Sequence, residues 1–127
     1  MSNKHPSPSL VFSTTDFYGN LVTLTQDTWR AHIVFYHPSM VGYESLVEKT
    51  IQDPQEIRLS LYSSTGVAFV SPRGVGPRPE GIRVLVNYAD TAYVKGATTG
   101  KVSTAYPVDL VKYRTPKLGK SIYKKGG

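Results

Sequence analysis

The chain has 127 residues, of which 39% are hydrophobic and 11% aromatic, and its formal net charge is +6. This length predicts one domain with a single modest core. Because the chain contains no cysteine, disulfides, thiolate metal sites and a thiol nucleophile are excluded. No stretch approaches the roughly 18 apolar residues of a membrane span, and the first residues lack the apolar segment of a secretion signal. We therefore expect a cytoplasmic protein that does not enter a membrane.

The charge is divided unevenly along the chain. Residues 1–69 hold four basic groups against six acidic ones, a net −2, whereas residues 70–127 hold eleven basic groups against three acidic ones, a net +8. A basic half of this kind is typical of proteins that neutralise phosphates. The alternative is a solvated basic surface. Nucleic acid is favoured because tyrosines that can stack on bases lie among the charges, namely Tyr88, Tyr93, Tyr106, Tyr113 and Tyr123.

The first third of the chain predicts a hairpin and a helix after a flexible lead over residues 1–9. Leu10–Thr14 and Leu21–Leu24 are short β-prone runs around a Gly-Asn reversal. A helix is predicted over residues 26–37, because Thr25 stands at the N-cap position and Pro38 ends the run. A second helix follows Gly42, with an apolar stripe from Tyr43 to Ile51, and Asp53-Pro54 ends it.

The rest of the chain changes to the two-residue period of strands. An antiparallel meander is the simplest arrangement of the strands that begin at Ile57, Val67, Arg83, Ala92 and Lys101. Ser71 to Gly81, rich in proline and glycine, is predicted to be a loop that projects positive charge from Arg73 and Arg78. Residues 113–127 form a basic tail in this interpretation, and residues 10–112 form the domain. The predicted fold is α+β, with an N-terminal hairpin and two helices packed on a four- to five-stranded antiparallel sheet.

Two of the three histidines, His32 and His37, lie in the first predicted helix beside the only tryptophan, Trp29. Histidine ionises near neutral pH, so this pair is a plausible acid/base element. The alternative is a packed or capping role, and His37 before Pro38 also fits a helix C-cap.

The order of these elements, with His32-Ile33 and His37-Pro38 on the first helix and a Ser103-Thr104-Ala105-Tyr106-Pro107 closing strand, resembles the BECR nucleases. That group joins barnase, EndoU, colicin-type tRNases and RelE, and the nearest branch is that of phage-associated and toxin-like small RNases. The resemblance spans about Leu10 to Lys112 and includes the stretches from Leu24 to Tyr43 and from Ile51 to Ile57. The chain departs from the pattern at Tyr36 and Ser39, where related members usually have Arg and Glu.

The resemblance implies metal-independent cleavage of RNA without a cofactor, in which the ribose 2′-OH attacks the adjacent phosphate. It implies His32 as general acid/base, with His37 as second choice. Arg58 would hold a phosphate, and Thr104 would donate a hydroxyl to it. The implied substrate-binding residues are Lys95, Ser103, Tyr106, Arg73, Arg78 and Arg83, the three arginines more as steering charges than as catalytic groups.

These assignments have structural alternatives. Arg58 also fits a cross-strand ion pair, Lys95 a solvent-exposed strand end, and Tyr106 a core position. Two rival classes of function stay open for the whole chain. One is an RNA-binding module on the same fold that has lost turnover, and the other is an interaction domain for an acidic partner such as an antitoxin or immunity protein. The RNA target, tRNA included, is not encoded in any motif.

Overall fold

The computed structural model describes residues 9–61, 63–71, 80–109 and 118–126. Seven strands form one sheet in the order β1-β2-β6-β5-β4-β3-β7. Their bounds are β1 Leu10–Thr15, β2 Leu21–Thr25, β3 Glu56–Ser60, β4 Gly66–Ser71, β5 Glu80–Tyr88, β6 Thr99–Asp109 and β7 Leu118–Lys124. The helical elements are α1 Gln26–Thr28, η1 Trp29–Val34, η2 Pro38–Met40, α2 Glu44–Gln52 and η3 Ala92–Lys95.

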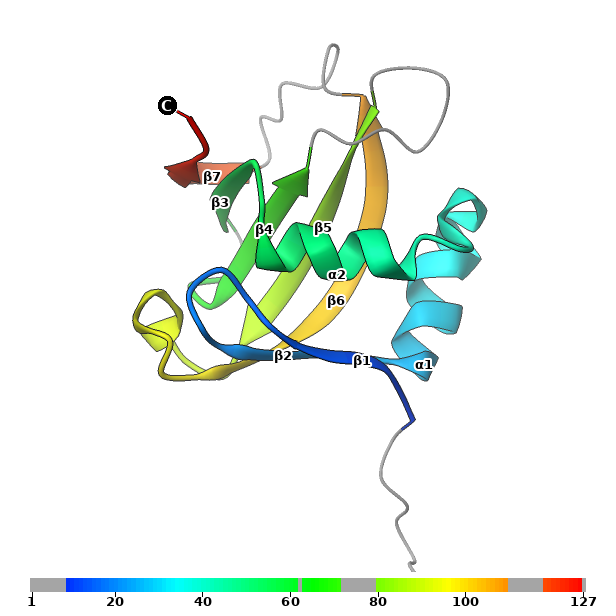
Figure 1. The fold of residues 1–127 in the computed structure, drawn as a ribbon, viewed down its shortest axis with the longest axis horizontal. Helices are drawn as coiled ribbons and strands as arrows, with labels where there is room; N and C mark the ends of the chain where they lie inside the picture. Colours follow the sequence, from blue (N-terminus) through cyan, green and yellow to red (C-terminus); the bar gives the residue numbers. More distant parts are fainter. Residues whose placement is uncertain (1–8, 62, 72–79, 110–117, 127) are drawn as a thin grey trace, which may run out of the picture.

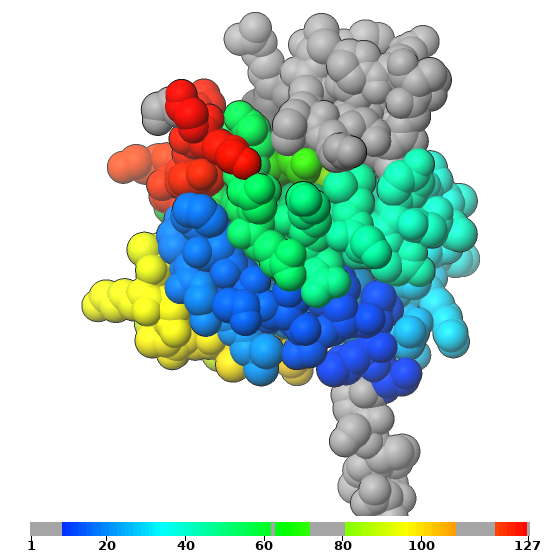
Figure 2. Space-filling model, viewed as in Figure 1, coloured from blue at the N-terminus to red at the C-terminus, as the bar shows by residue number. Residues whose placement is uncertain are grey.

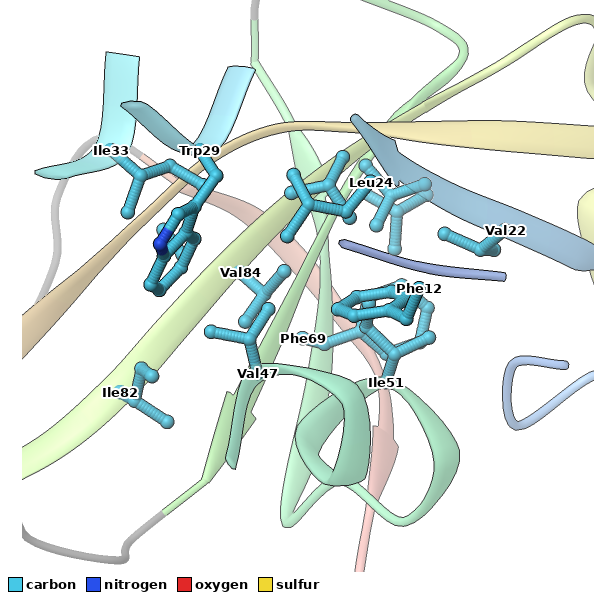
Figure 3. Close-up of a cluster of buried hydrophobic side chains, with 14 of the residues drawn as sticks. Phe12, Val22, Leu24, Trp29, Ile33, Val47, Ile51, Phe69, Ile82 and Val84 are labelled. Carbon is cyan, nitrogen blue, oxygen red and sulfur yellow. The ribbon is translucent and has the colours of Figure 1, made fainter. Parts of the chain in front are cut away.

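Helix α2 covers one face of the sheet and closes the core (Figure 1). Val47 and Ile51 are fully buried and lie one helical turn apart, so they form the apolar stripe expected of this helix. They pack with Phe69 and Val84, which come from the two middle strands β4 and β5 (Figure 3). Figure 2 shows the β1-β2 hairpin and α2 side by side on this face. The predicted hairpin and second helix are therefore confirmed.

The first helix begins where the sequence predicts, but its middle has an unexpected geometry. The Thr25 hydroxyl accepts a hydrogen bond from the Thr28 N–H at 3.1 Å, which confirms the N-cap. From Trp29 to Val34 the helix has the wider π form, which is rare and often found at functional sites. Trp29 and Ile33 are the buried residues of this segment, so the wider turn still directs an apolar stripe toward the core.

The sheet differs from the predicted one in size and in strand direction. β3, β4, β5 and β6 form the expected antiparallel meander. However, β2 pairs with β6 in parallel, which joins the hairpin to the same sheet and makes it mixed. This pairing covers only Thr99 to Lys101 of β6. Beyond Lys101, α1 and η1 lie beside β6 on that side.

Two further segments take a form that the sequence analysis did not predict. Ala92–Lys95 is a 3-10 helix and not a strand, because the Asp90 carboxylate accepts a hydrogen bond from the Ala92 N–H at 2.7 Å and starts a turn. Leu118–Lys124, expected within the basic tail, forms β7 and pairs with β3. Ile122 and Tyr123 pack against the core, and this apolar contact explains why the segment covers an edge that would otherwise be unpaired. Residues 1–8 of the expected lead lie outside the described residues.

A buried polar network ties the β1-β2 turn to the end of β5 and to η3. The Asp16 carboxylate accepts hydrogen bonds from the Tyr18 and Asn20 backbone N–H groups, both at 2.8 Å, from the Asn20 side-chain amide at 2.9 Å and from the Tyr88 hydroxyl. The Asn20 amide also donates to the Tyr93 carbonyl at 2.6 Å. Because these buried polar groups are hydrogen-bonded to one another, the network adds specificity without the cost of unsatisfied donors or acceptors.

Gly96 allows η3 to approach this turn. Its φ is +66°, and a Cβ at this position would lie 2.4 Å from the Tyr18 carbonyl oxygen. Only glycine satisfies both requirements.

We predict that Asn20→Ala lowers the free energy of unfolding by about 1–3 kcal/mol, because it removes two donated hydrogen bonds from buried acceptors. Urea unfolding of this variant and of Asn87→Ala measures the effect. Asn87 is exposed on β5, so its substitution is the matched control. Equal costs for the two variants would contradict the role of the network.

Burial and the hydrogen bond to Asp16 raise the pKa of Tyr88 far above the usual value of 10.0. Below pH 10 the tyrosine is protonated in both states and has no pH effect. Above pH 10 the unfolded chain loses this proton while the folded protein keeps it, so stability falls with pH, by about 1.4 kcal/mol per pH unit for one proton.

Unfolding of the wild type and of Tyr88→Phe between about pH 9 and 11.5 tests this prediction. The variant should lose less stability over this range than the wild type. Part of the slope should persist, because burial also raises the pKa of Tyr18. An exposed-site variant, Tyr36→Phe, should keep the wild-type slope, and identical slopes for all three proteins would refute the assignment.

Candidate active site

The alternating side chains of the central strand β5 show which residues lie on each face of the sheet. Val84 and its even-numbered neighbours on β5 are fully buried in the core that α2 closes. Because side chains alternate along a strand, Arg83 and Leu85 lie on the opposite face. Arg58 lies on the same side as Leu85 through its pairing with Ala68. We call this side, defined by Arg58 and Arg83, the arginine face.

Cross-strand pairing places four of the ten candidate site residues on the arginine face, in two adjacent rows. The first row consists of Glu56, Val70, Arg83 and Tyr106. The second row consists of Arg58, Ala68, Leu85 and Thr104. Since neighbouring strands lie about 4.8 Å apart, Arg83 and Tyr106 are direct neighbours, whereas Arg58 and Thr104 are separated by about 14 Å.

Tyr106 joins an imidazole and a guanidinium. Arg83 Nη1 donates a hydrogen bond to the Tyr106 hydroxyl at 3.0 Å, and Arg83 Cζ lies 5.4 Å from the centre of the same ring. The His37 ring lies against Tyr106 with the ring centres 5.4 Å apart and the planes tilted by 35°. Arg83 is only 4% exposed. A buried cation, a phenol and an imidazole therefore meet at one place, which we call the Tyr106 cluster.

The end of the first helix brings His37 to this cluster. The His37 N–H donates to the Ile33 carbonyl at 2.8 Å, and the His37 carbonyl accepts from the Met40 N–H at 2.9 Å. Ile33 and Met40 are both fully buried, so His37 is held between two core anchors. Pro38 ends the helix because its ring cannot continue the hydrogen-bond ladder. The resulting turn projects the imidazole toward the edge of β6.

His32 has a different environment. It is exposed on η1, between the buried residues Trp29 and Ile33. Among the residues that the structure describes, no hydrogen bond, ion pair or ring contact joins His32 to Arg58, Thr104 or Tyr106. The histidine that the sequence analysis ranked second is therefore the one that the fold places against the sheet.

Arg58 contacts residues of β3 and β7, the two strands at its edge of the sheet. Its Nε donates to the Gly119 carbonyl on β7 at 3.1 Å, and its Nη1 lies 3.4 Å from the Glu56 carboxylate. The ion pair joins Arg58 to Glu56 on the same strand, so it is not the cross-strand ion pair that the sequence suggested. The contact of Arg58 with the neighbouring strand is to the Gly119 backbone. The half-buried Arg58 guanidinium is thus two strands away from Arg83, and the fold does not bring it to the Tyr106 cluster.

The closing strand contains a bulge beside the cluster. The pairing of β5 with β6 shifts between Leu85 and Val86, and Ser103 is the extra residue. Its hydroxyl donates to the Leu85 carbonyl at 3.2 Å. Thr104 and Tyr106 pair with Leu85 and Arg83, so they share one face as predicted. Bulges of this kind are frequent next to active sites because they redirect side chains.

The remaining candidates lie elsewhere. Lys95 is exposed at the end of η3, which is near the start of β6, and Tyr106 lies about 20 Å further along that strand. Tyr88 and Tyr93 are buried and stacked on each other, so neither can receive a base, and Tyr123 packs on Phe17. Three candidates lie outside the described residues, namely Arg73, Arg78 and Tyr113.

Sequence reasoning missed two features of this region. It treated Arg83 as a steering charge, whereas Arg83 is buried against Tyr106. The alternation of Ile82, Val84 and Val86 contained the signal, since it places an arginine on the second face of a central strand. It also gave no role to Phe35 and Tyr36, whose rings are exposed beside His37.

No family model, curated protein or solved structure matches this chain. Within residues 9–61, 63–71, 80–109 and 118–126, no group of three or more histidine, aspartate or glutamate side chains is arranged to hold a metal ion. In the same residues no helix has both the length and the apolar character needed to cross a membrane.

We predict that Tyr106→Leu changes the NMR chemical shifts of the His37 ring protons, because the aromatic ring next to them is removed. The His32 ring protons serve as the control in the same spectrum and should not move. Unchanged His37 signals, or equal changes for both histidines, would contradict the contact.

Proposed function

We propose that this protein is a metal-independent endoribonuclease whose reaction takes place at the Tyr106 cluster. The observation that supports this proposal is the meeting of His37, Tyr106 and Arg83 on one face of the sheet. An imidazole supplies one of the two proton transfers of phosphodiester cleavage by an internal hydroxyl, and fixed hydrogen-bond donors beside it can stabilise the charge that develops on the phosphate. The resemblance to BECR nucleases points to the same reaction.

In the proposed reaction the ribose 2′-oxygen attacks the adjacent phosphorus, and the bond from phosphorus to the 5′-oxygen breaks. A base removes the 2′-OH proton, and an acid protonates the departing 5′-oxygen. The products are a 2′,3′-cyclic phosphate and a free 5′-hydroxyl. His37 performs one of these two proton transfers, as acceptor in its neutral form or as donor in its protonated form.

The burial of Arg83 assigns different roles to the two other groups. A guanidinium that is 4% exposed acts on a bound phosphate mainly through its charge. The Tyr106 hydroxyl accepts a hydrogen bond from this guanidinium, which polarises the phenol and makes its own O–H a better donor. Tyr106 is therefore the proposed contact to the phosphate oxygens, and Arg83 is its positioning residue.

The charge of the chain favours an RNA substrate. Residues 70–127, which include β5, β6 and β7, have a net charge of +8. The described part of this region has exposed lysines at Lys95, Lys101, Lys120, Lys124 and Lys125. Such charges attract a polyanion from a distance and release its counterions on binding.

A second candidate is an RNA-binding protein without turnover on the same fold. The burial of Arg83 favours it, because a guanidinium that is already engaged by a tyrosine has little surface left for a phosphate. The departures at Tyr36 and Ser39 from the usual pattern of the BECR nucleases point in the same direction.

The test is cleavage of a 5′-labelled RNA in EDTA by the wild type, by His37→Ala and by His32→Ala. We expect the wild type to produce fragments that end in a 2′,3′-cyclic phosphate. His37→Ala should lower the rate by about 100-fold or more, the usual contribution of an acid or base. His32→Ala, the same change on an exposed residue of the same helix, is the matched control and should stay close to the wild type.

Three results would count against the proposal. RNA binding without cleavage by folded wild type would favour the second candidate. Loss of activity in His32→Ala but not in His37→Ala would move the reaction away from the Tyr106 cluster. Cleavage that stops in EDTA and returns with added magnesium would overturn the metal-independent mechanism.

A further inference from the structure

The segment between His32 and Val41 presents two aromatic rings to solvent. Phe35 is 70% exposed and Tyr36 is 66% exposed. The two rings contact each other edge to face, with their centres 5.0 Å apart and their planes at 87°. Two adjacent exposed rings form a contiguous apolar patch, and binding of a partner can remove such a patch from water. We call this pair the aromatic pair.

The aromatic pair lies directly before the candidate catalytic residue. Tyr36 is the chain neighbour of His37, whose ring contacts Tyr106. The Cα atoms of Tyr36 and His37 are therefore about 3.8 Å apart. An RNA strand that extends from the Tyr106 cluster past His37 would therefore reach the aromatic pair.

The charge around the pair complements a nucleic acid. From residue 30 to residue 43 the chain contains one basic residue, Arg30, and no acidic residue. The Phe35 N–H donates to the Arg30 carbonyl, so the exposed Arg30 lies one wide helical turn from Phe35. A cation and an exposed ring on adjacent turns match the phosphate and the base of one nucleotide.

We propose that Phe35 and Tyr36 form a platform on which an unpaired base of single-stranded RNA stacks next to the reacting phosphate. This inference rests on the proposed RNA substrate and defines it further as single-stranded, because the face of a base is available for stacking only when the base leaves the duplex. The aromatic pair takes the base-stacking role that the sequence analysis gave to Tyr88 and Tyr93, which are buried.

Binding of short RNA to the full chain tests the platform. The probe is a fluorescein-labelled 2′-O-methyl oligonucleotide of about 8 nucleotides, a length within the site sizes of single-strand binders. The methyl group blocks the 2′-oxygen, so binding is measured without cleavage. The same oligonucleotide in a duplex is the second probe, and fluorescence anisotropy gives the affinity.

The variants separate stacking from other apolar contacts. We expect the double variant Phe35→Ala with Tyr36→Ala to bind the single strand about 10-fold more weakly or worse and the duplex as before. Phe35→Leu with Tyr36→Leu keeps apolar surface without a π face and should bind as weakly as the alanine pair. Tyr36→Trp should retain the wild-type affinity. The controls are Leu61→Ala and Val94→Ala, exposed at 57% and 53% in other parts of the fold.

Several outcomes would overturn the platform. Wild-type affinity of the double alanine variant for the single strand would refute the platform. Wild-type affinity of the double leucine variant would show that apolar contact without stacking is enough, as for a surface that binds a protein partner. If RNA is cleaved but these variants bind and cut normally, the platform fails and the ribonuclease stands. If the platform binds RNA that is never cut, the ribonuclease fails and the platform stands. A wild type that binds neither probe overturns the platform, and one that also leaves unmodified RNA uncut overturns the ribonuclease as well.

Discussion

The two-residue period of β5 is the constraint on which the rest of the fold depends. Ile82, Val84 and Val86 are fully buried in the core that α2 closes, and burying each side chain contributes about 1.5–3 kcal/mol. A shift of register by one residue would turn Arg83 into that core and remove Ile82, Val84 and Val86 from it. The core face therefore determines what lies on the arginine face, because a strand that buries its even-numbered residues in the core must place Arg83 on the other side, where it pairs with Tyr106.

A second constraint acts at the end of the first helix. Ile33 and Met40 are both fully buried, and the seven-residue step between them contains Pro38, so the chain must turn sharply between two fixed points. His37 lies in this turn and reaches Tyr106, whereas Phe35 and Tyr36 on the last helical turn face solvent. The imidazole contact and the exposed rings are thus two results of the same packing.

The arrangement around Tyr106 gives the proposed function a specific chemical form. The reacting phosphate would meet a phenol polarised by a buried guanidinium, with an imidazole on one side and the exposed aromatic pair beyond it. The positive charges proposed to attract RNA are mostly exposed lysines, whereas Arg83 at the cluster is shielded from solvent. Long-range attraction and local chemistry are therefore assigned to different residues, and each can be altered by mutation without the other.

The sequence by itself determined the local elements of this protein. Gly19-Asn20, Thr25, Pro38 and Pro54 mark the ends of the hairpin and of both helices, since turn and cap preferences act within a few residues. The alternation after Pro54 determined the meander and the shared face of Thr104 and Tyr106. Only the tertiary structure decided that β2 joins β6 in parallel, that β7 covers β3, and that His37 rather than His32 contacts Tyr106. These outcomes depend on pairings between residues 20 to 80 positions apart, where the packing of whole faces outweighs any local preference.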